Sequence, residues 1–107
     1  MYDNDNFATA RDFYNPVHCG DHDGFCFGEH VGFTQETAIL RGETPPRVKV
    51  GANANPRLRR HPKYCKAFRA AFPAGVAAGR ELARQQEILR QEAEFDAECD
   101  AVRLVEA

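Results

Sequence analysis

The most regular spacing of apolar residues begins near residue 63. Tyr64, Phe68 and Phe72 follow one another at intervals of four, which places them on one face of a helix. Pro62 suits the first turn of such a helix, whereas Pro73 lacks an N–H and clashes with the preceding turn. We therefore expect a helix from about residue 63, a break or kink at Pro73, and a second helix running to about residue 104.

This second helix carries two different faces. One side holds small and apolar residues and would allow another backbone to approach closely: Gly75, Val76, Gly79 and Leu82. Farther along, apolar residues repeat every seven positions, at Ile88, Phe95 and Val102. Because the intervening Gln85 and Glu92 are polar, this repeat predicts a poor coiled-coil seam.

The stretch from His18 to Phe33, HCGDHDGFCFGEHVGF, carries no sustained apolar period. Its even-numbered positions, 18 to 32, hold only His, Gly and Cys. A helix would include four glycines, each costing about 1 kcal/mol relative to alanine. We therefore expect a loop here, in which the glycines permit tight turns.

Shorter elements are expected on either side of this loop. We expect a short helix at residues 8–14, which Asn15 and Pro16 would end. We also expect two helical turns at residues 35–41, with Thr34 as the N-cap and Gly42 as the C-terminal stop. The remaining segments predict an extended connector at 44–46, a short strand at 47–50 and a turn at 51–56.

Charge divides the chain into three blocks. Residues 1–43 hold eight acidic and two basic side chains, residues 44–80 nine basic and no acidic ones, and residues 81–107 eight acidic and three basic ones. The net charge of -2 conceals this segregation, which bears on binding partners more than on fold. At 107 residues we expect one domain, of a mostly α class (small α or α+β), with an irregular glycine-rich N-terminal half and a long kinked or broken C-terminal helical segment.

The His18–Phe33 stretch is also a candidate metal site. Thiolate and imidazole groups suit zinc, and four of them close a structural site. The candidate ligands are Cys19, His22, Cys26 and His30, with His18, His61 or Cys65 as substitutes for one member. The alternative is that these side chains sit free on a surface loop.

Two catalytic or ionic alternatives have less support. The DHDG run at 21–24 resembles the start of a calcium loop, but the later ligands are missing at the required spacing. Cys19 or Cys26 next to histidine supplies the residue types of a nucleophilic site, yet no family signature accompanies them. We therefore expect a protein that is not an enzyme.

The basic block is the candidate nucleic-acid-binding segment. Arginine binds phosphate through two hydrogen bonds, and the nearby aromatic rings can stack on bases. The candidate residues are Arg47, Lys49, Arg57, Arg59, Arg60, Lys63, Lys66 and Arg69. The alternative is that this block pairs with the chain's own acidic flanks, in which case its charge would carry no information about a partner.

The sequence therefore predicts a small cytoplasmic regulator with reduced cysteines and no membrane segment, which docks on a nucleic acid or a nucleoprotein complex through its basic segment and which a zinc site would stabilise. A second hypothesis is an inhibitor of the phage or mobile-element type that binds a host protein through acidic surfaces.

Overall fold

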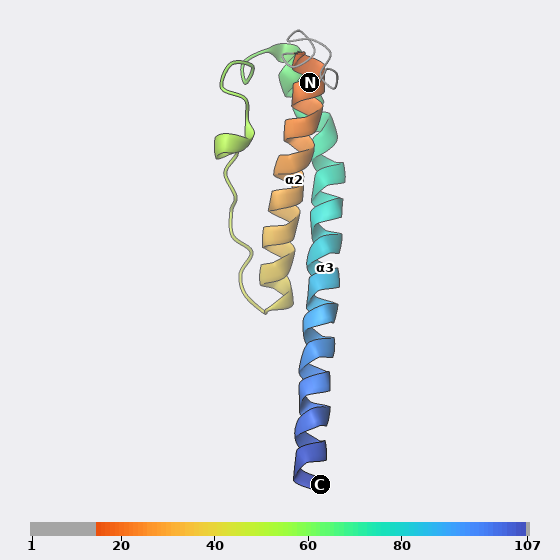
Figure 1. Ribbon diagram of the computed structural model, residues 1–107. Helices are drawn as coiled ribbons and strands as arrows, with labels where there is room; N and C mark the ends of the chain where they lie inside the picture. The colour runs from red at the N-terminus through yellow and green to blue at the C-terminus, as the bar shows by residue number, and fades with distance from the viewer. Residues whose placement is uncertain (1–14, 107) are drawn as a thin grey trace, which may run out of the picture.

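The protein is built from two long helices that lie side by side and run in the same direction. The computed structural model describes residues 15–106, and Figure 1 shows how they are arranged. Helix α2 spans Pro16–Leu40, the short 3-10 helix η1 spans Gly51–Asn53, and helix α3 spans Pro62–Glu106. The described residues contain no strand, so the expected mostly α class is confirmed. The expected helix at 8–14 lies outside the described residues.

Helix α2 begins where the sequence was expected to end a helix. The Asn15 side-chain oxygen accepts a hydrogen bond of 3.0 Å from the His18 N–H, and Pro16 occupies the first helical position. An Asn cap followed by proline satisfies one exposed donor and removes another. The Asn15-Pro16 pair therefore starts α2.

The expectation of a loop over the His18–Phe33 stretch is wrong, because the whole of it is helical. Its four glycines recur every four residues and all face α3. A Cβ atom placed on any of them would lie less than 3.0 Å from a backbone carbonyl oxygen of α3: Gly20 from Tyr64, Gly24 from Phe68, Gly28 from Phe72 and Gly32 from Val76. The local cost of glycine is offset because its missing side chain lets the two backbones touch.

Helix α3 also has glycines at the contact, which face the backbone of α2. A Cβ on Gly75 would come within 3.0 Å of the Phe25 carbonyl oxygen, and one on Gly79 would do the same to the Glu29 carbonyl oxygen. The narrow face expected around Gly75 and Gly79 is thus confirmed as a site of close backbone approach. Residue numbers increase in the same direction on α2 and α3 along this contact, as they must when two helices are parallel.

Aromatic rings flank the glycine contact at its N-terminal half. The ring of Phe27 lies 5.9 Å from that of Phe68 and 5.6 Å from that of Phe72, measured between centroids. Tyr64 is 2% exposed and packs 5.9 Å from Phe68. The predicted face of Tyr64, Phe68 and Phe72 therefore packs against α2, with Tyr64 buried and the two phenylalanines half-buried.

Gly42 ends α2, as predicted. Its φ of 74° is in the left-handed region, and its N–H donates to the Ile39 carbonyl. The Glu43 N–H then reaches back to the Ala38 carbonyl at 2.8 Å. These two hydrogen bonds give partners to carbonyl groups that would otherwise be unsatisfied in the last turn of α2. The two turns expected at 35–41 are the end of α2 and not a separate helix capped by Thr34.

Helix α3 begins at Pro62, as predicted, but it does not break at Pro73. The helix is assigned without interruption from Pro62 to Glu106, with Pro73 inside it. Pro73 is exposed, while its neighbours Phe72 and Gly75 pack on α2. These contacts with α2 lie on both sides of the proline and support the helix across the position of the lost hydrogen bond.

The segment that joins the helices returns along α2 to the end where α2 began (Figure 1). Such a long return is what a parallel arrangement of two helices demands. Residues 47–50 form no strand, and Gln35 ties the segment to α2 by donating a 3.1 Å hydrogen bond to the Pro46 carbonyl. The expected turn at 51–56 contains η1, with Gly51 at a φ of 50°. Neither helix, over the residues described, has a stretch long and apolar enough to cross a membrane.

The glycine contact makes a direct stability prediction. Gly28→Ala places a methyl group against the Phe72 carbonyl, so we expect it to lower the free energy of unfolding by about 1–3 kcal/mol. In an exposed helix the same change would stabilise by about 1 kcal/mol. Urea unfolding followed by circular dichroism measures the difference. Ala97→Leu, which enlarges an exposed residue of α3, is the control and should change stability by no more than about 0.5 kcal/mol. An increase in stability for Gly28→Ala would contradict the packing.

Candidate nucleic-acid interface

The second part of the basic segment, residues 57–69, lies at the end of the molecule where both helices begin, whereas Arg47 and Lys49 follow Pro46 on the part of the connection that runs beside α2. Residues 47–61 belong to the returning connection, and residues 62–69 form the first two turns of α3 (Figure 1). All eight candidate residues are exposed: Arg47, Lys49, Arg57, Arg59, Arg60, Lys63, Lys66 and Arg69. The two helix N-termini add partial positive charge at the same end, because their unpaired N–H groups point that way.

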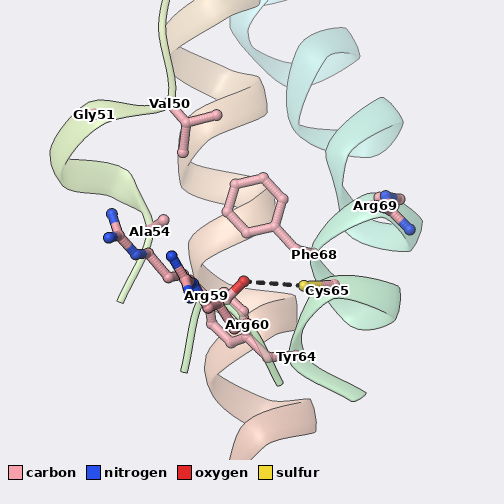
Figure 2. A pocket seen from close by; sticks show the side chains of 9 residues that line it. All are labelled: Val50, Gly51, Ala54, Arg59, Arg60, Tyr64, Cys65, Phe68 and Arg69. Atoms are coloured by element: carbon pink, nitrogen blue, oxygen red, sulfur yellow. Dashed lines mark hydrogen bonds between the residues drawn. The ribbon is translucent and has the colours of Figure 1, made fainter. Parts of the chain in front are cut away.

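A cavity of about 590 Å³ lies between the connection and α3, as Figure 2 shows. The connection contributes apolar atoms from Val50, Gly51 and Ala54, and α3 contributes aromatic surface from Tyr64 and Phe68. Cys65 and three arginines complete the lining: Arg59, Arg60 and Arg69. The cavity thus combines ring surface with guanidinium groups.

Tyr64 holds the floor of this cavity in place. Its hydroxyl donates a 2.6 Å hydrogen bond to the Asp23 carboxylate of α2 and accepts a 2.8 Å bond from the Asn55 N–H of the connection. Burial, followed by the bond to Asp23, raises the pKa of Tyr64 to about 12. One side chain therefore ties α2, α3 and the connection together.

Backbone and thiol contacts shape the opposite wall. The Asn55 carbonyl accepts from the N–H groups of Leu58 and Arg59, and the Asn55 side chain accepts from the Arg57 N–H at 2.9 Å. The Cys65 thiol donates to the Arg59 carbonyl at 3.1 Å, a bond drawn in Figure 2. These bonds fix the backbone from which Arg59 and Arg60 project.

Most of the basic groups lack an acidic partner within the described residues. Over 15–106, ion pairs of arginine involve Arg84, Arg90 and Arg103, all in the second half of α3. Arg59, Arg60 and Arg69 have no such pair with any residue described, and the same is true of Lys63 and Lys66. The alternative of self-neutralisation therefore finds no support in the acidic side chains of α2 and α3.

The predicted binding residues fall into two groups. Arg59, Arg60 and Arg69 line the cavity. Outside its lining lie Arg47, Lys49, Arg57, Lys63 and Lys66. Sequence reasoning missed Asp23 and Asn55 as the partners of Tyr64, and no spacing rule connects residues that lie so far apart along the chain.

The candidate zinc ligands are spread along α2. Cys19, His22, Cys26 and His30 share one side of the helix, but at about 1.5 Å per residue the first and last stand roughly 16 Å apart along its axis. His22 and Cys26 lie near each other, with the Nε2 and Sγ atoms 3.8 Å apart. No cluster of three or more potential ligands occurs among residues 15–106. Of the residues named as substitutes, His61 accepts a hydrogen bond from the Lys63 N–H, and the Cys65 thiol donates one to the Arg59 carbonyl.

The thiols on α2 are not activated. Burial raises the pKa of Cys19, and the Asp23 charge adds to this effect. Burial also raises the pKa of Cys26, with further contributions from Glu29 and Asp23. A raised pKa lowers the thiolate fraction at neutral pH, which is opposite to what a nucleophilic cysteine needs.

Comparison with known proteins adds no family to this description. No protein-family model, no curated protein and no solved structure matches the chain.

The Tyr64 contacts predict a specific pH dependence. Because the pKa of Tyr64 is raised, its contribution to stability is complete below about pH 10 and is lost as the pH rises toward 12. We expect Tyr64→Phe to destabilise the protein by about 1–3 kcal/mol at neutral pH, since Asp23 and the Asn55 N–H lose their partner. The stability gap between wild type and variant should narrow between pH 10 and 12. Urea unfolding at a series of pH values measures this gap; a gap that stays constant over that interval would contradict the assignment.

Zinc binding by Cys19, His22, Cys26 and His30 stays a prediction. If the site forms, native mass spectrometry of the reduced protein in zinc-containing buffer should show a stoichiometric adduct that a chelator removes. Cys26→Ser should abolish the adduct, because it takes away the thiol beside His22. Cys99→Ser, far along α3, is the control and should leave it unchanged. A metal-free mass under these conditions would disprove the site.

Proposed function

We propose that this protein docks on a nucleic acid or a nucleoprotein complex through the basic end of its helix pair. One observation carries the proposal: a cavity with aromatic surface is lined by three arginines that have no ion-pair partner among the described residues. Guanidinium groups bind phosphate oxygens in pairs, and aromatic surface receives bases by stacking. This combination of groups suits a phosphate backbone that carries bases.

The placement of the remaining cations extends this surface beyond the cavity. Lys63 and Lys66 are exposed on the first turns of α3, and Arg47 and Lys49 are exposed on the connection. A ligand that follows a chain of phosphates would meet several of these charges in succession. A small anion would use only the cavity.

The second hypothesis, an inhibitor that binds a host protein through acidic surfaces, draws on the other end of the molecule. The last turns of α3 expose a row of carboxylates beyond the end of α2: Glu92, Glu94, Asp96, Glu98 and Asp100. Acidic side chains can stand in for phosphates on a target that binds them. The cavity and its arginines have no part in this hypothesis, so the two make different predictions for charge reversal.

Charge reversal in the cavity tests the proposed function. We expect Arg59→Glu/Arg60→Glu to reduce binding to short RNA or DNA oligonucleotides roughly tenfold or more, because two phosphate contacts are replaced by repulsion. Fluorescence anisotropy over a series of salt concentrations measures the effect. The wild-type affinity should fall steeply with salt, and the variant should show a shallower dependence.

Arg103→Glu is the matched control, because Arg103 is exposed at the distal end of α3. This substitution should change the dissociation constant by no more than about twofold, since Arg103 does not line the cavity. Equal losses of binding free energy per reversed charge in Arg59→Glu/Arg60→Glu, which reverses two charges, and in Arg103→Glu, which reverses one, would show that only overall charge matters. No binding by the wild-type protein at low salt would exclude nucleic acid as the direct partner.

A further inference from the structure

The distal part of α3 extends past the end of α2 and exposes an apolar stripe. The end of α2 lies beside residues 83–90 of α3, where Leu40 and Arg41 share a surface hollow with Ala83 and Arg90. Beyond that point α3 continues to Glu106 with no other helix beside it among residues 15–106 (Figure 1). Ile88 is 55% exposed, Phe95 64% and Val102 53%. Their spacing of seven places all three on one side of the helix, and we name them the distal stripe.

An apolar groove lies on the other half of the molecule. It has a volume of about 470 Å³ and runs between α2 and α3. Its α3 side consists of alanines, Ala70, Ala71 and Ala74, and its α2 side of the exposed Phe25 ring together with His18, Asp21, His22 and Cys26. The groove shares no lining residue with the arginine cavity, so occupying it would leave that cavity open.

The surface beside the groove and the surroundings of the distal stripe carry opposite charge. Lys66 and Lys63 are exposed on α3 one and two turns before Ala70, on the same side of the helix, although the lining of the groove itself also includes the acidic Asp21. Carboxylates surround the distal stripe, at Glu92, Glu94, Asp96, Glu98 and Asp100. The acidic block that surrounds the stripe would repel a parallel copy of itself, but it would attract the basic start of α3 in an antiparallel copy.

Full overlap of two antiparallel copies brings the two surfaces together. If two copies of α3 lie antiparallel along their full length, Pro62 of one lies opposite Glu106 of the other. Phe95 then lies opposite Pro73, beside the alanines of the groove, and Val102 lies opposite Lys66. By symmetry, each copy inserts Phe95 into the groove of the other, while Ile88 and Val102 lie against α3 on either side of it, and this closes the assembly at two chains.

We propose that this chain forms an antiparallel homodimer in which Phe95, at the centre of the distal stripe of each copy, occupies the alanine groove of the other. The dimer goes beyond the proposed function and does not depend on it, since it forms without nucleic acid. It places the two arginine cavities at opposite ends of one assembly.

Sedimentation equilibrium of the full chain over a dilution series tests the proposal. We expect a dimer whose dissociation constant rises with salt, because acidic and basic surfaces meet. Phe95→Glu should raise the dissociation constant roughly tenfold or more, since it buries a charge at the centre of the contact. Leu89→Glu is the matched control: Leu89 is also 64% exposed, but it lies on another side of α3 and should leave the dimer intact.

A cross-link tests the orientation. In the antiparallel arrangement Cys99 lies opposite Arg69 and Ala70 of the second copy, so Ala70→Cys should form a disulfide between residue 70 and Cys99 of the other chain under mild oxidation. Peptide mass spectrometry identifies the linked pair. A Cys99–Cys99 disulfide would instead show a parallel dimer and overturn the proposal. A monomer at all concentrations, or equal effects of Phe95→Glu and Leu89→Glu, would also overturn it.

Discussion

The direct contact between the backbones of α2 and α3 is the constraint on which the rest of the structure depends. Six glycines, four on α2 and two on α3, leave no room for a Cβ atom at the contact. Two helices that approach this closely gain dispersion contacts along their length and bring Cα–H groups to opposing carbonyls. These gains offset a local cost of roughly 1 kcal/mol per glycine in the helix interior. The offset is available only when both helices are present, so the fold of α2 depends on α3.

The parallel direction of the pair decides where charge ends up. Because α2 and α3 run the same way, both N-termini and the returning connection meet at one end, and the basic segment lies in these elements. An antiparallel pair with a short turn would have placed the start of α3 beside the end of α2. The side chain of Tyr64 fixes the position of the cavity walls, because its hydroxyl is hydrogen-bonded both to the Asp23 carboxylate of α2 and to the Asn55 N–H of the connection.

Because α3 is longer than α2, the acidic residues of its last turns lie far from the basic residues at its start. Helix α2 has 25 residues and α3 has 45, so the last turns of α3 have no helix beside them among the residues described. The acidic block lies there together with the exposed stripe that includes Phe95. The molecule is therefore a rod with a basic end and an acidic end, and this shape underlies both the proposed docking surface and the proposed dimer.

The sequence alone determined the features that depend on neighbouring residues. Gly42 ends α2 and Pro62 begins α3 because a left-handed φ and a missing donor are local requirements. The spacing of Tyr64, Phe68 and Phe72 marked a buried face, and the charge blocks were plain from composition. The tertiary structure decided what depends on a distant partner. The glycines of α2 are helical only because α3 covers them, and α3 passes through Pro73 because α2 holds both flanks. Likewise, Asp23 meets Tyr64 only through the packing of the two helices, since residues so distant in sequence interact only once tertiary contacts bring them together.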